Sequence, residues 1–358
     1  MDISKYIPSA YSNKTDSGKV SRQSPSNIAL VKYWGKYGNQ LPKNPSISFT
    51  LENCHTRTTL SYQSKESKGF DFEVYKDGRR EEGFEPKILK FFQRVEQYLP
   101  FLENYNFRID TTNSFPHSSG IASSASGMSA LALCLMDMEK QMYPEMKEDF
   151  ILEKASFLSR LGSGSACRSL EGPIVVWGEH PDIQGSSDLF GTKYEGEVHE
   201  NFQNYRDTIL LVDVGEKQVS STVGHDLMHN HPFAERRFDR AKENLSRMIP
   251  VLKEGNLSEF IEIVESEALS LHAMMLTSNP YFILMKPNTL EIINRIWSYR
   301  KDTGSHLCFT LDAGANVHLL YPDNENDEVL EFIKNDLSKF CSDGSFIEDW
   351  MGTGARKI

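Results

Sequence analysis

Residues 113–130 read NSFPHSSGIASSASGMSA, and they pass directly into the apolar, helix-forming run LALCLM at 131–136. Small residues leave backbone N–H groups approachable, and a loop that enters a helix N-terminus directs several unpaired N–H groups at one point. Before the loop, residues 105–111 (YNFRIDT) alternate in the manner of a strand. The local order is therefore strand, loop, helix, and it predicts a phosphate-binding site.

An ordinary surface loop is the competing interpretation of this stretch. The Walker pattern is absent, because no Gly-Lys-Ser/Thr closes the loop, so serines would have to supply what that lysine and hydroxyl supply. On residue types alone, a Ser/Gly-rich surface loop is favoured about twofold over an anion site. The decision between the two depends on the rest of the chain.

The composition sets limits on class and partners. With 358 residues, 39% of them hydrophobic, the chain can bury a large core, and its length favours two domains. The net charge of −11 argues against nucleic acid and against an anionic membrane as partners, because either would need a basic face. An anionic substrate must therefore be met by a local basic cluster.

The cysteines and the termini point to a compartment. Five cysteines are scattered, without a CxxC pair or a histidine cluster at metal spacing, so we expect reduced thiols in a cytoplasmic protein. The polar N-terminus has no apolar segment of the signal-peptide kind, and no later segment approaches membrane-spanning length. We therefore expect neither an export signal nor a membrane anchor.

Periodicity gives a coarse element order. Residues 1–25 look like a loosely ordered leader, and strands and a helix in the next hundred residues suggest an antiparallel-leaning α+β unit. An acidic, Gly-rich stretch at 178–204 suggests a domain boundary near its end. The strands are expected at 46–51, 55–62, 70–75, 105–111, 173–177, 208–214, 306–311, 316–321 and 344–350, and the helices at 85–98, after the Ser-rich loop, and at 147–161, 231–253, 256–276, 287–301 and 327–339.

Lys32 lies inside the apolar run NIALVKYW at 27–34. A lysine there would lose much hydration energy unless an opposite charge pairs with it. The side chain could instead reach the surface along its aliphatic stem. From this segment alone, the two accounts are equally supported.

Four separated segments together resemble one family. They are NIALVKYWGK (27–36), FPHSSGIASSASG (115–127), GSGSACRSLEG (162–172) and DAGAN (312–316), and QVSST at 218–222 matches as well. In this order and at these separations they resemble the mevalonate diphosphate decarboxylases of the GHMP small-molecule kinase superfamily, over about residues 26 to 322. The resemblance implies ATP-dependent decarboxylation of mevalonate 5-diphosphate to isopentenyl diphosphate, ADP, phosphate and CO2, with ATP and Mg2+ required.

The resemblance also implies an architecture. It is the two-domain α+β GHMP kinase fold, with a ribosomal protein S5 domain 2-like N-terminal domain at 26–204 and a ferredoxin-like C-terminal domain at 205–358. A cleft between the domains and a homodimer are implied as well.

Three residues carry the chemistry that the resemblance implies. Asp312 faces the C3 hydroxyl and accepts its proton; because a carboxylate of reference pKa about 3.9 is a weak base for an alcohol, we expect late proton acceptance. Lys32 is the expected partner that keeps this carboxylate ionised. Arg168 can hold the substrate carboxylate with two parallel hydrogen bonds. In isolation, Asp312 could be a turn aspartate and Arg168 a surface ion pair.

Further residues are implied for binding. For the substrate these are Asn27, Tyr33, Lys36, Ser165, Arg168, Ser220 and Ser221, with Tyr33 and Lys36 on the diphosphate. For the nucleotide they are Ser118, Ser119, Gly120, Ala122, Ser123 and Ser124, and Ser123 and Ser124 would also reach Mg2+ through the ATP phosphates. Lys36 could otherwise be a solvated loop charge, and Ser220 and Ser221 an ordinary loop pair.

Some positions depart from the family pattern or stay outside it. His117 lies in the phosphate loop where the family commonly has threonine, and Ala315 replaces the proline of Asp-Ala-Gly-Pro-Asn. The histidines at 225, 229 and 231 are expected on an exposed turn, and the ten histidines form no visible metal set.

Other functions remain open at this point. The chain could be a phosphomevalonate-specific decarboxylase or a GHMP small-molecule kinase. The phosphate loop of mevalonate kinases reads Gly-Leu-Gly-Ser-Ser-Ala, whereas this chain has Gly120-Ile-Ala-Ser-Ser-Ala. The presence of Lys32 and Asp312 also favours the decarboxylase. A non-catalytic nucleotide-binding homologue is the alternative from a different class, and the intact Lys32, Arg168 and Asp312 argue against it.

Overall fold

The computed structural model describes residues 2–116, 121–215 and 221–358, with the main chain alone at 221 and 222. In the described part of the chain, the larger sheet follows the order β14-β1-β4-β7-β5-β6, with β8 and β9 joined beside the first part of β4. Neighbouring strands run antiparallel except β5 and β7, which are parallel. The strands of this sheet are β1 (Ser17–Val31), β4 (Ser46–Ser64), β5 (Asp71–Lys76), β6 (Arg79–Arg80), β7 (Tyr105–Asn113), β8 (Ile174–Trp177), β9 (Gly191–Lys193) and β14 (Arg356–Lys357).

The start of the chain differs from the expected leader. β1 begins at Ser17 and pairs along its length with β4, and Tyr6 is fully buried, with its ring stacked 4.3 Å from that of Phe157. The prediction of a loose leader is therefore wrong for residues 17–25. These residues are mostly polar, and the buried ones include Gln23, Ser24 and Pro25, so no apolar alternation marks the strand in the sequence.

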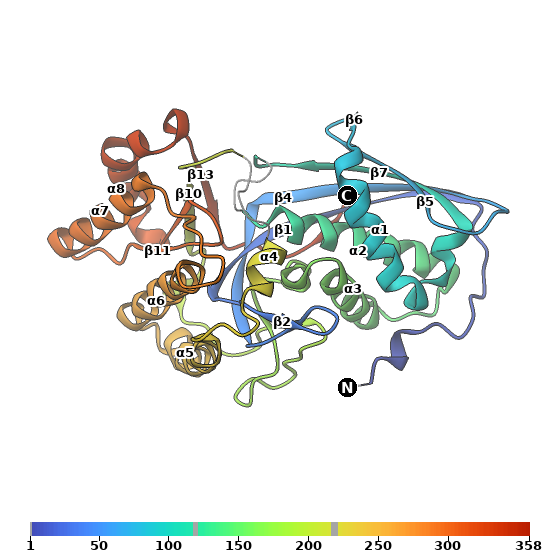
Figure 1. The fold of residues 1–358 in the computed structure, drawn as a ribbon, viewed down its shortest axis with the longest axis horizontal. Helices are drawn as coiled ribbons and strands as arrows, with labels where there is room; N and C mark the ends of the chain where they lie inside the picture. The colour runs from blue at the N-terminus through green and yellow to red at the C-terminus, as the bar shows by residue number, and fades with distance from the viewer. Residues whose placement is uncertain (1, 117–120, 216–220) are drawn as a thin grey trace.

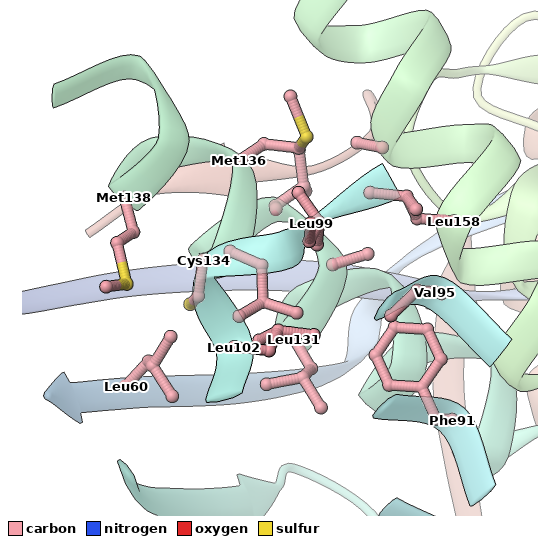
Figure 2. Packing of buried hydrophobic residues seen from close by; sticks show 14 of the residues in the cluster. Leu60, Phe91, Val95, Leu99, Leu102, Leu131, Cys134, Met136, Met138 and Leu158 are labelled. Atoms are coloured by element: carbon pink, nitrogen blue, oxygen red, sulfur yellow. The ribbon is translucent and has the colours of Figure 1, made fainter. Parts of the chain in front are cut away.

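Three helices cover one face of the larger sheet (Figure 1). They are α1 (Glu85–Val95), α2 (Ser123–Met142) and α3 (Glu148–Gly162). Leu131 and Cys134 of α2 lie between Leu60 of β4 and side chains of α1 and α3, as Figure 2 shows. Because α2 is central to this core, its N-terminus is anchored to the sheet.

The second half of the chain forms a smaller sheet with its own helices. Its strands follow the order β11-β12-β10-β13. They are β10 (Arg206–Leu210), β11 (Cys308–Thr310), β12 (Val317–Tyr321) and β13 (Phe346–Trp350), and the helices are α4 (Ser221–Asp226), α5 (Ala234–Glu254), α6 (Leu257–Leu276), α7 (Pro287–Thr303) and α8 (Asn326–Phe332), the last followed by a π-helical turn at Ile333–Leu337. The predicted long helices of this half are thus confirmed to within a few residues. Short β2 (Lys36–Tyr37) and β3 (Leu41–Pro42) form a separate hairpin.

The two halves are joined at several places. Asp349 of β13 accepts hydrogen bonds from the N–H groups of Glu52, Asn53 and Cys54 in β4, at 2.9, 2.8 and 2.7 Å. β14 then pairs with β1, so the last residues of the chain belong to the first sheet. Among the described residues, no helix has both the length and the apolar character needed to cross a membrane.

Candidate active site

A lysine–aspartate pair lies where the two halves meet. Lys32 directly follows β1 and Asp312 follows β11, and Lys32 Nζ is 2.9 Å from Asp312 Oδ1. The lysine side chain is 2% exposed and the aspartate 29%. Burial lowers the pKa of Lys32, and the carboxylate of Asp312 counteracts this. Of the two arrangements that the sequence left open for Lys32, the structure therefore shows the ion pair. The Asp312 carboxylate stays accessible.

The main chain of this pair is held by helices of the second half. The backbone N–H of Lys32 donates to Glu267 Oε2 at 2.8 Å, and its carbonyl accepts from Arg237 Nη2 at 3.2 Å. Arg237 and Glu267 form a buried ion pair at 2.6 Å. His272, one turn further along α6, donates from Nε2 to the carbonyl of Asp312 at 3.1 Å. Helix α6 thus fixes the backbone on both sides of the ion pair.

Arg168 is buried beside this pair. It ends the 3-10 turn Gly164–Arg168, which follows α3, and donates from Nη1 to Ser46 Oγ at 2.5 Å and from Nε to Asn27 Oδ1 at 3.3 Å. Burial lowers the pKa of Arg168, while the charge of Asp312 raises it. A buried guanidinium held by neutral acceptors retains its charge for an anionic ligand.

Asn27 and Ser165 lie in the same cluster. Asn27 donates from Nδ2 to Ser169 Oγ at 2.7 Å and to the carbonyl of Ser165 at 3.4 Å. Ser165 is half-buried. Asn27 therefore connects Ser165 to Arg168, and all three are implied substrate residues.

Tyr33 and Lys36 lie on the segment that leaves β1. The Tyr33 ring packs against Trp177, with centroids 4.6 Å apart, and against His225 at 4.3 Å. Burial lowers the pKa of the half-buried Lys36, and Asp226 opposes that effect. The implied diphosphate contacts therefore lie beside the aromatic cluster formed by Tyr33, Trp177 and His225.

The histidine expectation needs correction. His225 and His231 are both 8% exposed, so they do not lie on an exposed turn. His225 packs on the rings of two aromatic residues, and His231 contacts the carbonyl of Met274 at 3.1 Å. Burial of an aromatic side chain against other rings outweighs the hydration of a neutral imidazole. Only His229 of the three is exposed.

A left-handed residue directly precedes α2. Ala122 has φ 45° and is the N-cap of α2, which begins at Ser123. Ser26 Oγ donates to the carbonyl of Ile121 at 2.6 Å and fixes the loop to β1. The unpaired N–H groups of the first turn of a helix attract anions.

A pocket of about 220 Å³ opens beside this helix start. Ser123 and Ser124 line it together with apolar and threonine side chains of β4, β5 and β7. Lys87 of α1 also lines it and donates to Ser124 Oγ at 2.7 Å. An apolar cavity that ends at hydroxyls, a lysine and a helix N-terminus suits a nucleotide. Mg2+ is commonly held through phosphates with few protein ligands, so the Ser123 and Ser124 hydroxyls fit it.

Several implied binding residues cannot be placed. Ser118, Ser119, Gly120 and Ser220 lie outside the described residues, as does His117. Ser221 begins α4, and its side chain is outside the description as well.

Four side chains that contact the site residues were not assigned to the site from the sequence. Ser46, Lys87 and Glu267 were not singled out, and His225 was expected on an exposed turn, yet these four contact Arg168, Ser124, Lys32 and Tyr33, respectively. Ser46 begins an alternating strand directly after Pro45, so only its position offered a signal. The other three come from helices whose faces could not be assigned to the site before the fold was known.

The family models for this chemistry match both halves of the chain. The model "Diphosphomevalonate decarboxylase-like N-terminal domain" matches residues 24–188, and "Mevalonate 5-diphosphate decarboxylase C-terminal domain" matches 208–351. A diphosphomevalonate decarboxylase of Ganoderma lucidum is 30% identical over 88% of this chain and 81% of its own length, and one of Candida albicans is 30% identical over 88% and 87%.

Solved structures agree with these relatives. Mevalonate diphosphate decarboxylase from Staphylococcus aureus has a TM-score of 0.81 and 25% identity, covering 96% of this chain and 98% of that one. A structure described as MDDEF in complex with MVAPP, AMPPCP and magnesium has a TM-score of 0.80 and 27% identity, covering 95% and 99%. The expected two-domain GHMP architecture is thereby confirmed. The chain belongs to the mevalonate diphosphate decarboxylase family.

Proposed function

We propose that the chain catalyses the ATP-dependent decarboxylation of mevalonate 5-diphosphate to isopentenyl diphosphate, with release of ADP, phosphate and CO2. The relatives are diphosphomevalonate decarboxylases, and a related structure holds MVAPP, an ATP analogue and magnesium. The observation that carries the proposal is the Lys32–Asp312 pair, whose accessible carboxylate lies near the buried Arg168. A kinase of the same superfamily is disfavoured, because both family models describe decarboxylases.

The reaction needs a leaving group at C3, because a 3-hydroxy acid has no electron sink to receive the electrons of the C–C bond. ATP supplies it by phosphorylating the C3 hydroxyl. Phosphoryl transfer passes through a loose transition state, so correct positioning and charge neutralisation contribute more than a strong base. Asp312 orients the hydroxyl and accepts its proton late, and Lys32 keeps the carboxylate ionised.

Arg168 serves the second half of the reaction. Its guanidinium holds the substrate carboxylate in line with the C3–O bond that breaks, while Asn27 and Ser46 hold the guanidinium. Breaking the C–O bond leaves positive charge at C3, which the expelled phosphate stabilises. The C–C bond electrons then form the double bond as CO2 departs.

The binding residues divide between two places. Tyr33 and Lys36 contact the diphosphate, with Ser165 beside Arg168 and Ser220 and Ser221 closing on the substrate phosphate. Ser123, Ser124 and the loop at 118–122 hold the ATP phosphates and, through them, Mg2+. Lys87, which lies on Ser124, adds positive charge there.

The test is product formation by the purified protein with Mg-ATP. Mevalonate 5-diphosphate, the 5-monophosphate and free mevalonate are compared, and CO2 and ADP are measured separately. We expect equal amounts of CO2 and ADP with the diphosphate. CO2 with the monophosphate would change the substrate and keep the mechanism, ADP without CO2 would mean a kinase, and neither product would mean a binding protein.

We propose three further properties on the same basis. The domain boundary lies near residue 204, which the gap between the matched ranges 24–188 and 208–351 supports. The protein is a cytoplasmic homodimer; its five buried free thiols support the reducing compartment. Sedimentation velocity and the location of a fluorescent fusion test these proposals.

A further inference from the structure

His225 lies against the segment that carries the diphosphate-binding residues. It belongs to α4, yet its ring lies between two rings of the chain that leaves β1, 4.3 Å from that of Tyr33 and 4.5 Å from that of Trp34. The side chain is buried. A residue from the second half of the chain is thus inserted between consecutive side chains of the first half.

A hydrogen bond fixes the tautomer of this histidine. Nδ1 accepts the backbone N–H of Gly35 at 3.0 Å, so Nδ1 carries no proton and the neutral ring is protonated at Nε2. Burial, with the charges of Lys36 and Arg168 acting in the same direction, lowers the pKa of His225 to about 3. At neutral pH the ring is therefore a neutral acceptor for the Gly35 N–H.

Gly35 is the turning point between Tyr33 and Lys36. The φ angle of Gly35 is +92°, a left-handed conformation that glycine adopts readily and other residues adopt rarely. A Cβ at Gly35 would also lie 2.9 Å from the ring of Phe238. A flexible residue in such a turn loses much backbone entropy when ordered, so a partner for its N–H stabilises the turn.

The backbone of α4 approaches this segment closely. A Cβ at Gly224 would lie 2.7 Å from the ring of Trp34, so glycine permits the contact that brings His225 into place. On the other side, Tyr33 packs on Trp177, and Trp177 lies under the guanidinium of Arg168 at 5.9 Å. A continuous row of packed groups therefore runs from His225 through Tyr33 and Trp177 to Arg168.

We propose that His225 is a positioning residue for the substrate diphosphate. Its Nδ1 holds the Gly35 turn, and its ring holds Tyr33, so that Tyr33 and Lys36 present their polar atoms to the diphosphate in one geometry. This role rests on the proposed function of Tyr33 and Lys36. It predicts that loss of the histidine weakens binding of the diphosphate substrate and leaves the nucleotide site, at Ser123 and Lys87, unaffected.

Three variants separate the hydrogen bond from the packing. His225→Asn keeps an acceptor at the position of Nδ1, because Oδ1 of asparagine is bonded to Cγ as Nδ1 of histidine is. His225→Phe keeps an aromatic ring and removes the acceptor, and His225→Ala removes both. His229→Asn, at an exposed position four residues away, is the matched control.

Steady-state kinetics with Mg-ATP and mevalonate 5-diphosphate, together with thermal unfolding, test the proposal. We expect the KM for the diphosphate to rise about 10-fold in His225→Phe and further in His225→Ala, with partial recovery in His225→Asn, because one hydrogen bond in a site contributes about that factor. The KM for ATP should stay within about twofold in all variants that unfold cooperatively.

The outcomes distinguish this inference from the proposed function. If the wild type releases no CO2, the proposed function fails before any variant is compared. If the wild type is active and His225→Phe has the wild-type KM for the diphosphate, the hydrogen-bond role of His225 is overturned. Equal increases in both KM values would mean a general structural role, which also overturns it.

Discussion

Lys32 Nζ lies 2.9 Å from Asp312 Oδ1, and this contact joins residues 280 positions apart in the chain. The lysine is enclosed, while the aspartate is partly exposed, so one partner supplies charge from within and the other presents a carboxylate to the site. An opposite charge within hydrogen-bond distance favours the ionised form of a carboxylate. The first prediction concerns this asymmetry.

Asp312→Asn should lower kcat by about 10²- to 10⁴-fold, the usual contribution of a positioned acid or base. Substrate and ATP binding, measured by calorimetry, should be largely retained, because the change leaves the binding residues in place. The variant should also unfold at a lower temperature, since Lys32 would be a buried charge without its counter-ion. Near wild-type turnover would contradict the role of Asp312.

Arg168→Lys should lose most of the rate while it keeps the positive charge. A single ammonium cannot replace two parallel guanidinium hydrogen bonds, and it also loses either the Ser46 or the Asn27 contact. CO2 and ADP should be measured separately in single-turnover experiments. A wild-type rate of CO2 release would rule out the carboxylate clamp.

Ser46→Ala tests how Arg168 is held. Removal of the hydroxyl leaves a buried guanidinium N–H without its acceptor, and such losses cost about 1–3 kcal/mol, which is about 5- to 150-fold in kcat/KM if the cost is expressed in the transition state. Ser48→Ala is the matched control, because the Ser48 hydroxyl is buried without a hydrogen-bond partner in the described structure. Equal effects of the two changes on kcat/KM would contradict the assignment.

Lys87→Ala should raise the KM for ATP by about 5-fold, since a solvent-facing contact to phosphate contributes on the order of 1 kcal/mol. The KM for the diphosphate substrate should not change, because Lys87 lines the pocket that we propose for the nucleotide. Lys301→Ala, at an exposed position of α7, is the control. A change confined to the KM for the diphosphate would place the nucleotide elsewhere.

Asp349 should make stability depend on pH. Burial, with the nearby charge of Asp207 adding to it, raises the pKa of Asp349 from 3.8 to about 6 despite four backbone N–H donors. The folded state therefore binds the proton more tightly than the unfolded state does, so the contribution of this group to stability is present below pH 4 and is lost as pH rises to about 6.

Denaturant unfolding of the wild type and of Asp349→Asn at several pH values measures this loss. The free energy of unfolding of the wild type relative to the variant should fall by about 3 kcal/mol between pH 3.5 and pH 6.5, since one pKa unit corresponds to about 1.4 kcal/mol. Buried histidines whose pKa is lowered make the free energy of unfolding rise with pH, which is the opposite effect. Both proteins contain these histidines, so their effect cancels when the two free energies are subtracted. A pH-independent difference would show that the Asp349 pKa is not raised.

The sequence pattern was sufficient to predict the helices and strands whose side chains follow a regular apolar period. The three long helices of the second half were predicted because their apolar residues recur at helical spacing, and strand alternation located β7 and β12. The strand at residues 17–25 was missed because a polar strand shows no apolar periodicity. The two strands expected at 46–51 and 55–62 form one strand, since nothing in the local sequence requires a break between them.

The sequence by itself determined the family, the order of the elements and the identity of the charged residues in the site, because motif residues and periodicity are properties of neighbouring positions. The sequence made Asp312 the expected partner of Lys32, but only the tertiary structure decided that the two charges meet and that the lysine does not reach the surface. It pairs Lys32 with Asp312, inserts His225 beside Tyr33, and places Glu267 on the backbone of Lys32. These contacts join positions up to 280 residues apart, and their geometry depends on how β1 packs against helices of the second half, which no local pattern encodes.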